Sequence, residues 1–564
     1  MTRSLRGALI ALFALFAMAA PASAIVPPNA DWHEYYIADS TPYPVGQPTL
    51  HADLMVPKGT KMDGTQKLPV ILSIGPYFNH SGQTMGETPT DDGPQLRWND
   101  LIKDGKVFEH GYALLQVDLR GFGGSQGCND FGGPGEQNDV VRAIQWAKAQ
   151  PWSTGKVAIF GKSYDGWTGV MGLNGDSKDL SAAIIQSPII DGYRTLYQDG
   201  VHYATSWYAT PGIYQADDAM PPALGDFTDG HTDYIAGWAT GENPACYATN
   251  ILMQDGLQTH DDAAGFWKAR DLPNARGSSV PTFWSHGFLD VNTKPDNFLP
   301  VWSSLTGPKH AWFGQYHHTR PNEDDDAGST GRHQYFYGEL FSFLDEYMKA
   351  APHVALPPVE VENSDGKWRS EDVFPPADGV NHAINLRAGS YTDSPTASDS
   401  VWSITPPLDH DAWISGVTHA AVNLTTTAPN AVVIARFWDI DAGGNAAMIS
   451  RGAGVYTGSG AGTKTVELYP ADFVIHTGHR IGVEITANDD LYTPTPSGQT
   501  VTVTSGTLTA PYLTFSRTKA DRWPQLPGTK SKDQSGRETK KVDAATITAN
   551  PTTWDEPAAM VARP

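Results

Sequence analysis

The sequence predicts an α/β domain with a mostly parallel sheet, followed by an all-β domain. Between residues 68 and 350, short apolar runs alternate with helical patterns, which is typical of parallel strands joined by helices. After about residue 357 the helical patterns fade, and short alternating strands rich in Thr, Ser, Gly and Val recur. The Pro-rich segment 351–358 is the expected linker between the two domains.

Six apolar runs of the first domain are too continuous for half-exposed strands, so we expect them to be buried in the sheet. They are Pro69–Ile74, Tyr112–Leu119, Lys156–Phe160, Ala182–Pro188, Pro281–Phe288 and Lys309–Tyr316. The stretch Asn138–Ala149 carries its apolar residues at helical spacing. The long aromatic segment from about residue 191 to 275 interrupts the alternation, and we expect it to cap the strand ends.

The second domain is predicted to be an antiparallel β-sandwich. Its expected strands are His419–Thr426, Ala431–Ile440, Lys464–Pro470, His479–Ala487 and Gln499–Gly506. The segment Asp439–Asn445 resembles part of a calcium loop but lacks the glutamate at the required spacing, so a hairpin turn is favoured. The acidic run Glu323–Asp326 is interpreted as a solvated loop, and no metal site is expected.

The first 24 residues have the pattern of a secretory signal peptide. Arg3 and Arg6 precede the apolar run Ala8–Ala20, and Ala22–Ala24 offers a small-residue cleavage site. We therefore expect a secreted or periplasmic protein; an uncleaved amphipathic anchor is the alternative. No other stretch reaches the roughly 18 apolar residues that a membrane span needs.

The net charge of the chain narrows its possible partners, and its two cysteines indicate a disulfide. With 62 acidic and 39 basic residues, the chain has a net charge of −23, which disfavours nucleic acids and anionic membrane surfaces. An exported chain meets oxidising conditions, so Cys128 and Cys246 are expected to form a disulfide; two buried thiols are the alternative.

Ser163 is the candidate nucleophile. It stands in Gly161–Gly166 (GKSYDG), directly after a buried strand and before a helical stretch. The second glycine comes one residue later than in the G-x-S-x-G elbow of many serine hydrolases. A serine needs a base, and the base needs an orienting carboxylate, so Ser163 alone does not establish an active site.

The rest of a triad occurs in the expected order, each member after a strand. Asp290 is the favoured carboxylate and Asp296 the runner-up, while His318 or His317 would be the base. His286 and His310 lie within strand patterns and are interpreted as core residues. The backbone N–H of Tyr164 and the hydroxyl of Tyr77 are the expected oxyanion donors.

These segments resemble the X-Pro dipeptidyl-peptidase and cocaine esterase family. The late glycine and the Tyr after Ser match its G-x-S-Y-x-G signature, and His286–Pro295 resembles the acid segment of X-Pro dipeptidyl-peptidases. The segment Gly314–His318 resembles G-P-W-x-H of the esterase branch, a register that selects His318. Gln315-Tyr316 departs from the usual Pro-Trp, and Gly75–Tyr77 resembles the oxyanion tyrosine segment.

The resemblance implies an α/β-hydrolase core (residues 25–356, with a helical cap at about 191–275) and a C-terminal jelly-roll, galactose-binding-like domain (357–564). It implies a serine hydrolase without cofactor that acts on X-Pro peptides or, alternatively, on small esters or amides. A homo-oligomer is possible within the family. A peptidase needs an anion for the substrate ammonium; Asp191 and Asp199 are candidates, though a surface role is favoured for each. A non-catalytic carbohydrate or surface binder is the third hypothesis.

Overall fold

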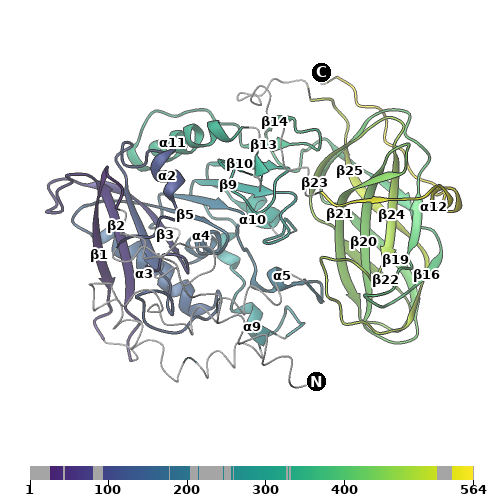
Figure 1. The fold of residues 1–564 in the computed structure, drawn as a ribbon, viewed down its shortest axis with the longest axis horizontal. Helices are drawn as coiled ribbons and strands as arrows, with labels where there is room; N and C mark the ends of the chain where they lie inside the picture. The colour runs from purple at the N-terminus through teal and green to yellow at the C-terminus, as the bar shows by residue number, and fades with distance from the viewer. Residues whose placement is uncertain are drawn as a thin grey trace, which may run out of the picture.

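The computed structural model consists of two units joined side by side (Figure 1). The residues it describes are 26–41, 45–80, 93–176, 178–203, 214, 246, 256–257, 259–296, 298–325, 328–329, 332–517 and 537–562. The expected signal peptide, residues 1–24, and most of the expected cap lie outside these residues. No helix in the described part of the chain combines the length and apolarity required to cross a membrane.

The first unit is built on a ten-stranded sheet in the order β1-β2-β4-β3-β5-β6-β9-β10-β13-β14. Along the chain, its strands are β1 Ala30–Ile37, β2 Leu50–Pro57, β3 Leu68–Gly75, β4 Ala113–Asp118, β5 Ser153–Lys162, β6 Ala182–Gln186, β9 Thr282–Gly287, β10 Lys309–Gly314, β13 Val359–Glu362 and β14 Trp368–Glu371. All six predicted strands are present. The strands from β4 to β13 in the sheet order pair in parallel, whereas the edge strands β1, β2 and β14 are antiparallel.

Helices cover both faces of this sheet, as the alternating pattern predicts. On one face α3 (Pro134–Ala149), α4 (Tyr164–Gly175) and α10 (Phe298–Ser304) share a core with the strands; on the other face α2 (Asn99–Lys103) and α11 (His333–Lys349) do so. The shorter elements are α5 Gly192–Leu196, β7 Tyr197–Gln198, β8 Val201–His202, α9 Gly265–Lys268, the 3₁₀ helix Pro273–Ala275, β11 Asp324–Asp325 and β12 Gly328–Ser329.

The predicted boundary at residue 357 falls too early. Strand β13 begins at Val359 and pairs in parallel with β10, and β14 follows it antiparallel up to Glu371. The Pro-rich segment therefore leads into the edge of the first sheet and not into the second unit. The prediction failed because two four-residue strands carry too little pattern to reveal their partner.

The second unit consists of two antiparallel sheets that share one apolar core. The first contains β15 Gly379–Asn385, β16 Gly389–Thr392, β18 Ala412–Gly416, β19 His419–Thr426, β22 Gly460–Glu467, β23 Ala471–Ile475 and β25 Thr500–Leu513. The second contains β17 Val401–Ile404, β20 Ala431–Ile440, β21 Asn445–Tyr456, β24 Arg480–Thr486 and β26 Thr539–Lys541, and α12 spans Ala544–Ala549. The Asp439–Asn445 segment is the predicted hairpin turn, in which Asp441 accepts from the N–H of Asn445.

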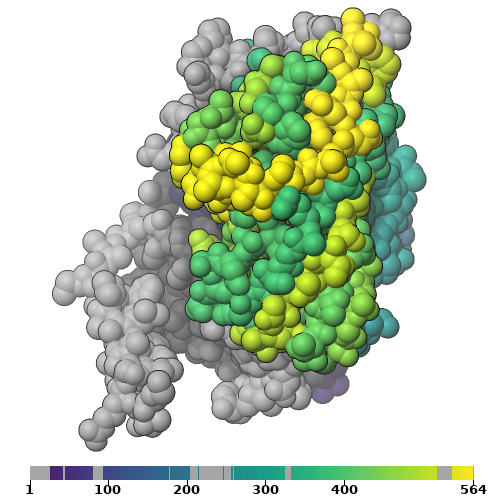
Figure 2. All heavy atoms as spheres, turned by 90° about the vertical axis from the view of Figure 1, so that its right-hand side faces the viewer, coloured from purple at the N-terminus to yellow at the C-terminus, as the bar shows by residue number. Residues whose placement is uncertain are grey.

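The last described residues cross the outside of this unit, where they form the yellow band over the green surface (Figure 2). Strand β26 pairs with β21, and Trp554 bridges to Ile384 of β15. The two units meet at polar contacts: the Gln315 side chain donates to the carbonyl of Asp472 (3.0 Å), and Tyr469 donates to Tyr203 (2.7 Å). The Gln315 departure from the family pattern thus serves as a link between the units.

Candidate active site

Ser163 occupies a sharp turn between β5 and α4. Its backbone angles are φ 65° and ψ −122°, a strained conformation for a residue with a side chain. A Cβ at Gly161 would lie 2.2 Å from the carbonyl oxygen of Asp165, and one at Gly166 would lie 2.9 Å from the carbonyl oxygen of Gln186. The late glycine is therefore required because α4 packs directly against the end of β6.

Asp290 and His318 form a hydrogen-bonded pair at the same edge of the sheet. They follow the C-terminal ends of β9 and β10, and Nδ1 of His318 lies 2.9 Å from Oδ2 of Asp290. The other carboxylate oxygen, Oδ1, accepts the backbone N–H groups of Asn292 (2.8 Å) and Thr293 (3.0 Å), and the Thr293 hydroxyl donates to Oδ2 (2.8 Å). Because Nδ1 is engaged, Nε2 is the nitrogen left for proton transfer.

The hydrogen bonds of the site distinguish between the two candidate bases and between the two candidate acids. His317 directs Nδ1 to the carbonyl of Leu289 (2.9 Å), so His318 is the histidine that meets Asp290. Asp296 is buried near Arg194 and Lys294, which partly offset the rise in its pKa that burial causes. Among the described residues, Asp290 and not Asp296 is the carboxylate that pairs with His318.

The two core histidines differ in their surroundings. His310 pairs with Glu339 (3.0 Å), whereas His286 is buried and stacks on Phe298. Burial lowers the pKa of His286 to about 4, so this imidazole is neutral at physiological pH. Both are core residues, as predicted.

The electrostatics suit a neutral base beside an ionised acid. Burial alone would raise the pKa of Asp290, but His318 and Thr293 hold it well below its usual range. Burial lowers the pKa of His318, with Asp290 opposing and the Lys162 ammonium adding to that effect. Burial also lowers the pKa of Lys162 to about 8. His318 is therefore neutral near pH 7 and able to accept a proton.

Both expected oxyanion donors border Ser163. Tyr77 is buried, and its hydroxyl contacts the hydroxyl of Tyr214 and the side chain of Ser163. The guanidinium of Arg97 lies 3.6 Å from the centroid of the Tyr77 ring. Tyr164 is the first residue of α4, so its backbone N–H has no acceptor within the helix.

The two carboxylates considered for a substrate ammonium are engaged elsewhere. Asp191 accepts the backbone N–H groups of Tyr193 (2.8 Å) and Arg194 (3.3 Å) at the start of α5. Asp199 is half exposed and pairs with Lys464 of the second unit. Asp199 has the surface role that the sequence favoured, whereas Asp191 is partly buried and caps α5.

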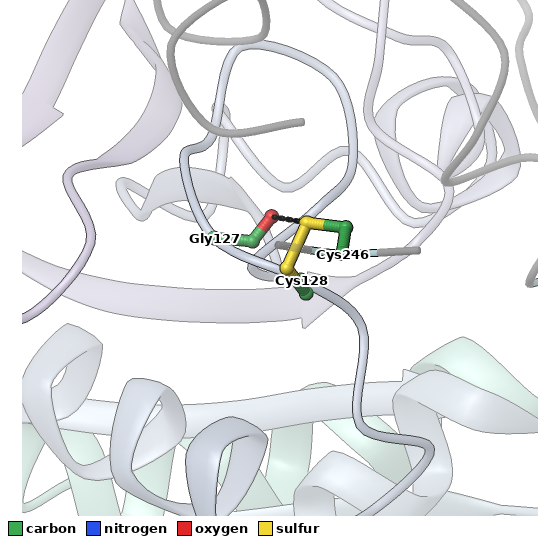
Figure 3. Close-up of a disulfide and its surroundings, with 3 residues drawn as sticks. All are labelled: Gly127, Cys128 and Cys246. Carbon is green, nitrogen blue, oxygen red and sulfur yellow. Dashed lines mark hydrogen bonds between the residues drawn. A yellow bond between two sulfur atoms is a disulfide. The ribbon is translucent and has the colours of Figure 1, made fainter. Parts of the chain in front are cut away.

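Cys128 and Cys246 form the expected disulfide (Figure 3). Cys128 lies in the loop after β4, and the sulfur of Cys246 is 3.8 Å from the carbonyl oxygen of Gly127. The bond joins the loop after β4 to a residue of the expected cap that is 118 positions further along the chain.

Two residues of the site were missed from the sequence. Arg97 donates from Nε to Asp165 (2.6 Å), and thereby holds the turn after Ser163. Thr293 contacts both members of the His318–Asp290 pair, at 3.4 Å and 2.8 Å. Thr293 lies three residues after Asp290, but no sequence pattern marked it as a partner of that carboxylate. No local signal identifies Arg97.

Two family models match the chain. Residues 47–320 match the X-Pro dipeptidyl-peptidase (S15 family), and residues 382–457 match the X-Pro dipeptidyl-peptidase C-terminal non-catalytic domain.

Curated relatives carry related names. A "Putative Xaa-Pro dipeptidyl-peptidase" of Streptomyces avermitilis is 25% identical over 442 residues, which is 69% of this chain and 61% of that protein. Another, from Bacillus cereus, is 24% identical over 539 residues, covering 80% of this chain and 85% of its own length. The match thus spans less than two thirds of the first relative.

Solved structures share the fold. A CocE/NonD family hydrolase from Staphylococcus aureus superposes with a TM-score of 0.64 at 16% identity, covering 83% of this chain and 92% of its own. An α-amino acid ester hydrolase gives a TM-score of 0.64 at 17% identity, covering 86% and 97%. These similarities establish an α/β-hydrolase fold with a β-rich C-terminal domain.

Proposed function

Because this chain belongs to the X-Pro dipeptidyl-peptidase (S15) family of hydrolases, we propose that it releases X-Pro dipeptides through an acyl-enzyme on Ser163. The observation that supports this most is the 2.9 Å contact between His318 Nδ1 and Asp290 Oδ2, at the edge of the sheet where Ser163 occupies its strained turn. A serine after β5, an acid after β9 and a base after β10, all parallel strands of one sheet, are the parts that acyl transfer requires.

The proposed reaction begins with proton transfer from the Ser163 hydroxyl to Nε2 of His318 while the serine oxygen attacks the substrate carbonyl. Asp290 keeps the remaining imidazole proton on Nδ1 and stabilises the imidazolium. The imidazolium then protonates the leaving amine. Water, deprotonated by the same Nε2, releases the acyl group and restores Ser163. These steps use only groups of this chain, the substrate and water.

The tetrahedral intermediate places a negative charge on the former carbonyl oxygen. We assign its stabilisation to the Tyr77 hydroxyl and the Tyr164 backbone N–H. Since Tyr77 already contacts the side chain of Ser163, it is close to the bond that changes. The nearby Arg97 guanidinium favours negative charge at the same place.

The proposal is tested with an X-Pro p-nitroanilide assayed beside short p-nitrophenyl esters. We expect turnover of the anilide, and its loss in Ser163→Ala with unchanged thermal unfolding. Turnover of esters alone would refute the peptidase assignment, and unchanged turnover by Ser163→Ala would refute the nucleophile.

A carboxylesterase or amide acylase is the second candidate. It is favoured by one observation: Asp191 and Asp199, the carboxylates considered for a substrate ammonium, are committed to a helix start and to Lys464. An esterase needs no such anion. The fold neighbours include a protein named as an α-amino acid ester hydrolase, which fits an ester-cleaving function.

We further propose that residues 1–24 direct export and that the second unit is a jelly-roll, galactose-binding-like domain. Export is supported by the charged start, apolar run and cleavage site of the sequence. N-terminal sequencing of the protein recovered outside the cytoplasm should begin at Ile25; recovery of uncleaved chain from membranes would favour the anchor.

A further inference from the structure

A cluster of buried ionisable side chains lies in the first unit, apart from the Ser163, Asp290 and His318 groups. His51 and Asp53 come from β2, Glu34 comes from β1, His80 follows β3, and Asp118 ends β4. Solvent does not reach the side chains of His51, Asp53, His80 and Asp118. The Glu34 side chain is 9% exposed. Burying several carboxylates together is costly unless cations neutralise them.

The distances within the cluster match the spacing of metal ligands. His51 Nε2 lies 3.2 Å from Glu34 Oε1 and 3.8 Å from Asp53 Oδ1, and His80 Nε2 lies 3.0 Å from Asp53 Oδ2. One ligand atom from each of His51, Asp53 and His80 lies within 4.8 Å of the other two. Ligands at 2.0–2.1 Å from a tetrahedral ion are about 3.3 Å apart, which falls inside this range.

The hydrogen bonding of His51 indicates where a cation belongs. Its Nδ1 is 2.9 Å from Asp118 Oδ2, and because a carboxylate only accepts, Nδ1 carries a hydrogen. Nε2 then faces the two carboxylates of Glu34 and Asp53. A proton on Nε2 would reach Glu34 at 3.2 Å, but 3.8 Å to Asp53 is too long for a hydrogen bond. Asp53 Oδ1 instead accepts from Nε1 of Trp32 (2.7 Å), and Glu34 Oε1 also accepts from the Tyr36 hydroxyl (2.9 Å). One metal ion would replace the protons that His51 shares with Glu34 and that His80 shares with Asp53.

The surroundings supply the support that metal ligands usually have. A carboxylate bonded to the far nitrogen of a ligating histidine fixes its orientation, as Asp118 does for His51. Asp53 is oriented in the same way, because Nε1 of Trp32 donates to its Oδ1 (2.7 Å).

We propose that His51, Asp53, His80 and Glu34 bind one divalent transition-metal ion, with zinc favoured by two imidazoles and two carboxylates. The ion would join β1, β2 and the segment after β3. Since His80 is only three residues after Tyr77, it would also restrain the segment that carries the proposed oxyanion hydroxyl. The site does not depend on which bond Ser163 cleaves.

A second buried cluster provides a matched control. His310, Glu339 and Glu360 also converge, but here a cationic side chain already lies against the two carboxylates. The Arg332 guanidinium is 2.9 Å from Glu360 and 3.5 Å from Glu339. A buried arginine neutralises these carboxylates, so this cluster needs no metal.

The test is the metal content of the mature chain, purified without chelator, incubated with zinc and passed through gel filtration. We expect about one zinc per chain, lost in His80→Gln and in Asp53→Asn but retained in His310→Gln. Adding a chelator to the wild-type protein should lower its unfolding temperature, a measurement that does not depend on the variants folding.

Two outcomes would overturn the proposal. One is wild-type protein that retains no zinc and whose unfolding temperature a chelator leaves unchanged; the cluster would then be neutralised by protons on the two imidazoles. The other is a variant lacking His80 or Asp53 that keeps the full metal content, which would place the ion elsewhere.

Discussion

Replacing Asp290 by asparagine should reverse the tautomer of His318. Oδ1 of Asp290 accepts two backbone N–H groups, from Asn292 and Thr293, so the amide oxygen of the substituted side chain must stay at that position. The amide NH₂ then replaces Oδ2, which faces His318 Nδ1 at 2.9 Å and the Thr293 hydroxyl at 2.8 Å. An NH₂ group donates, so Nδ1 must accept and the imidazole proton moves to Nε2.

With its proton on Nε2, His318 cannot accept the proton of Ser163. We expect kcat to fall by about 10⁴, which corresponds to about 5.5 kcal/mol of transition-state stabilisation. Thermal unfolding should change little because the backbone donors keep their acceptor. The assay is hydrolysis of the best chromogenic substrate from the experiment above, followed at saturating concentration.

Asp296→Asn is the matched control, because Asp296 was the alternative acid and is also buried. It should retain activity within about tenfold of the wild type. If Asp290→Asn is nearly as active as the wild type, or if Asp296→Asn is the variant that loses activity, the assignment of the acid is wrong.

Three further predictions concern the pH profile, the turn and the disulfide. Lys162→Met removes a positive charge that lowers the pKa of His318, so the acid limb of kcat/KM should move to higher pH; an unmoved limb would show that Lys162 does not act on the base. Gly161→Ala should destabilise the fold by about 1–3 kcal/mol in denaturant titrations, because its Cβ would lie 2.2 Å from the Asp165 carbonyl oxygen; wild-type stability would contradict this close approach. Cys128→Ser opens a link across 118 residues and should cost about 2–5 kcal/mol of unfolding free energy, whereas equal stability with and without reductant in the wild type would argue against the bond.

Much of the site could be predicted from the sequence because the relevant signals are local. A buried strand followed by a serine between glycines defines a turn within a few residues, and Asp290 likewise follows a strand directly. The choice between His317 and His318 was made by family resemblance. In the structure it depends on which of two adjacent imidazoles reaches Asp290 and which reaches the carbonyl of Leu289.

Contacts between distant segments could not be predicted in this way. Arg97 is 68 residues from the Asp165 that it bonds, and Asp199 meets a lysine of the second unit. The cluster around His51 combines residues of β1, β2, β4 and the segment after β3, and no single stretch of sequence reveals it. Strands β13 and β14 were likewise assigned to the wrong side of the domain boundary.

The sequence by itself determined the class of the two units, the order of the sheet's central strands along the chain and the positions of Ser163, Asp290 and Tyr77. Apolar periodicity and turn chemistry act between neighbouring residues, so they can be read along the chain. Only the tertiary structure decided which oxygen of Asp290 meets His318 and which buried charges share a site. It also explained why the second glycine of the turn stands at Gly166, three residues after Ser163. Those outcomes depend on how separate elements pack, and packing brings together residues that the sequence keeps far apart.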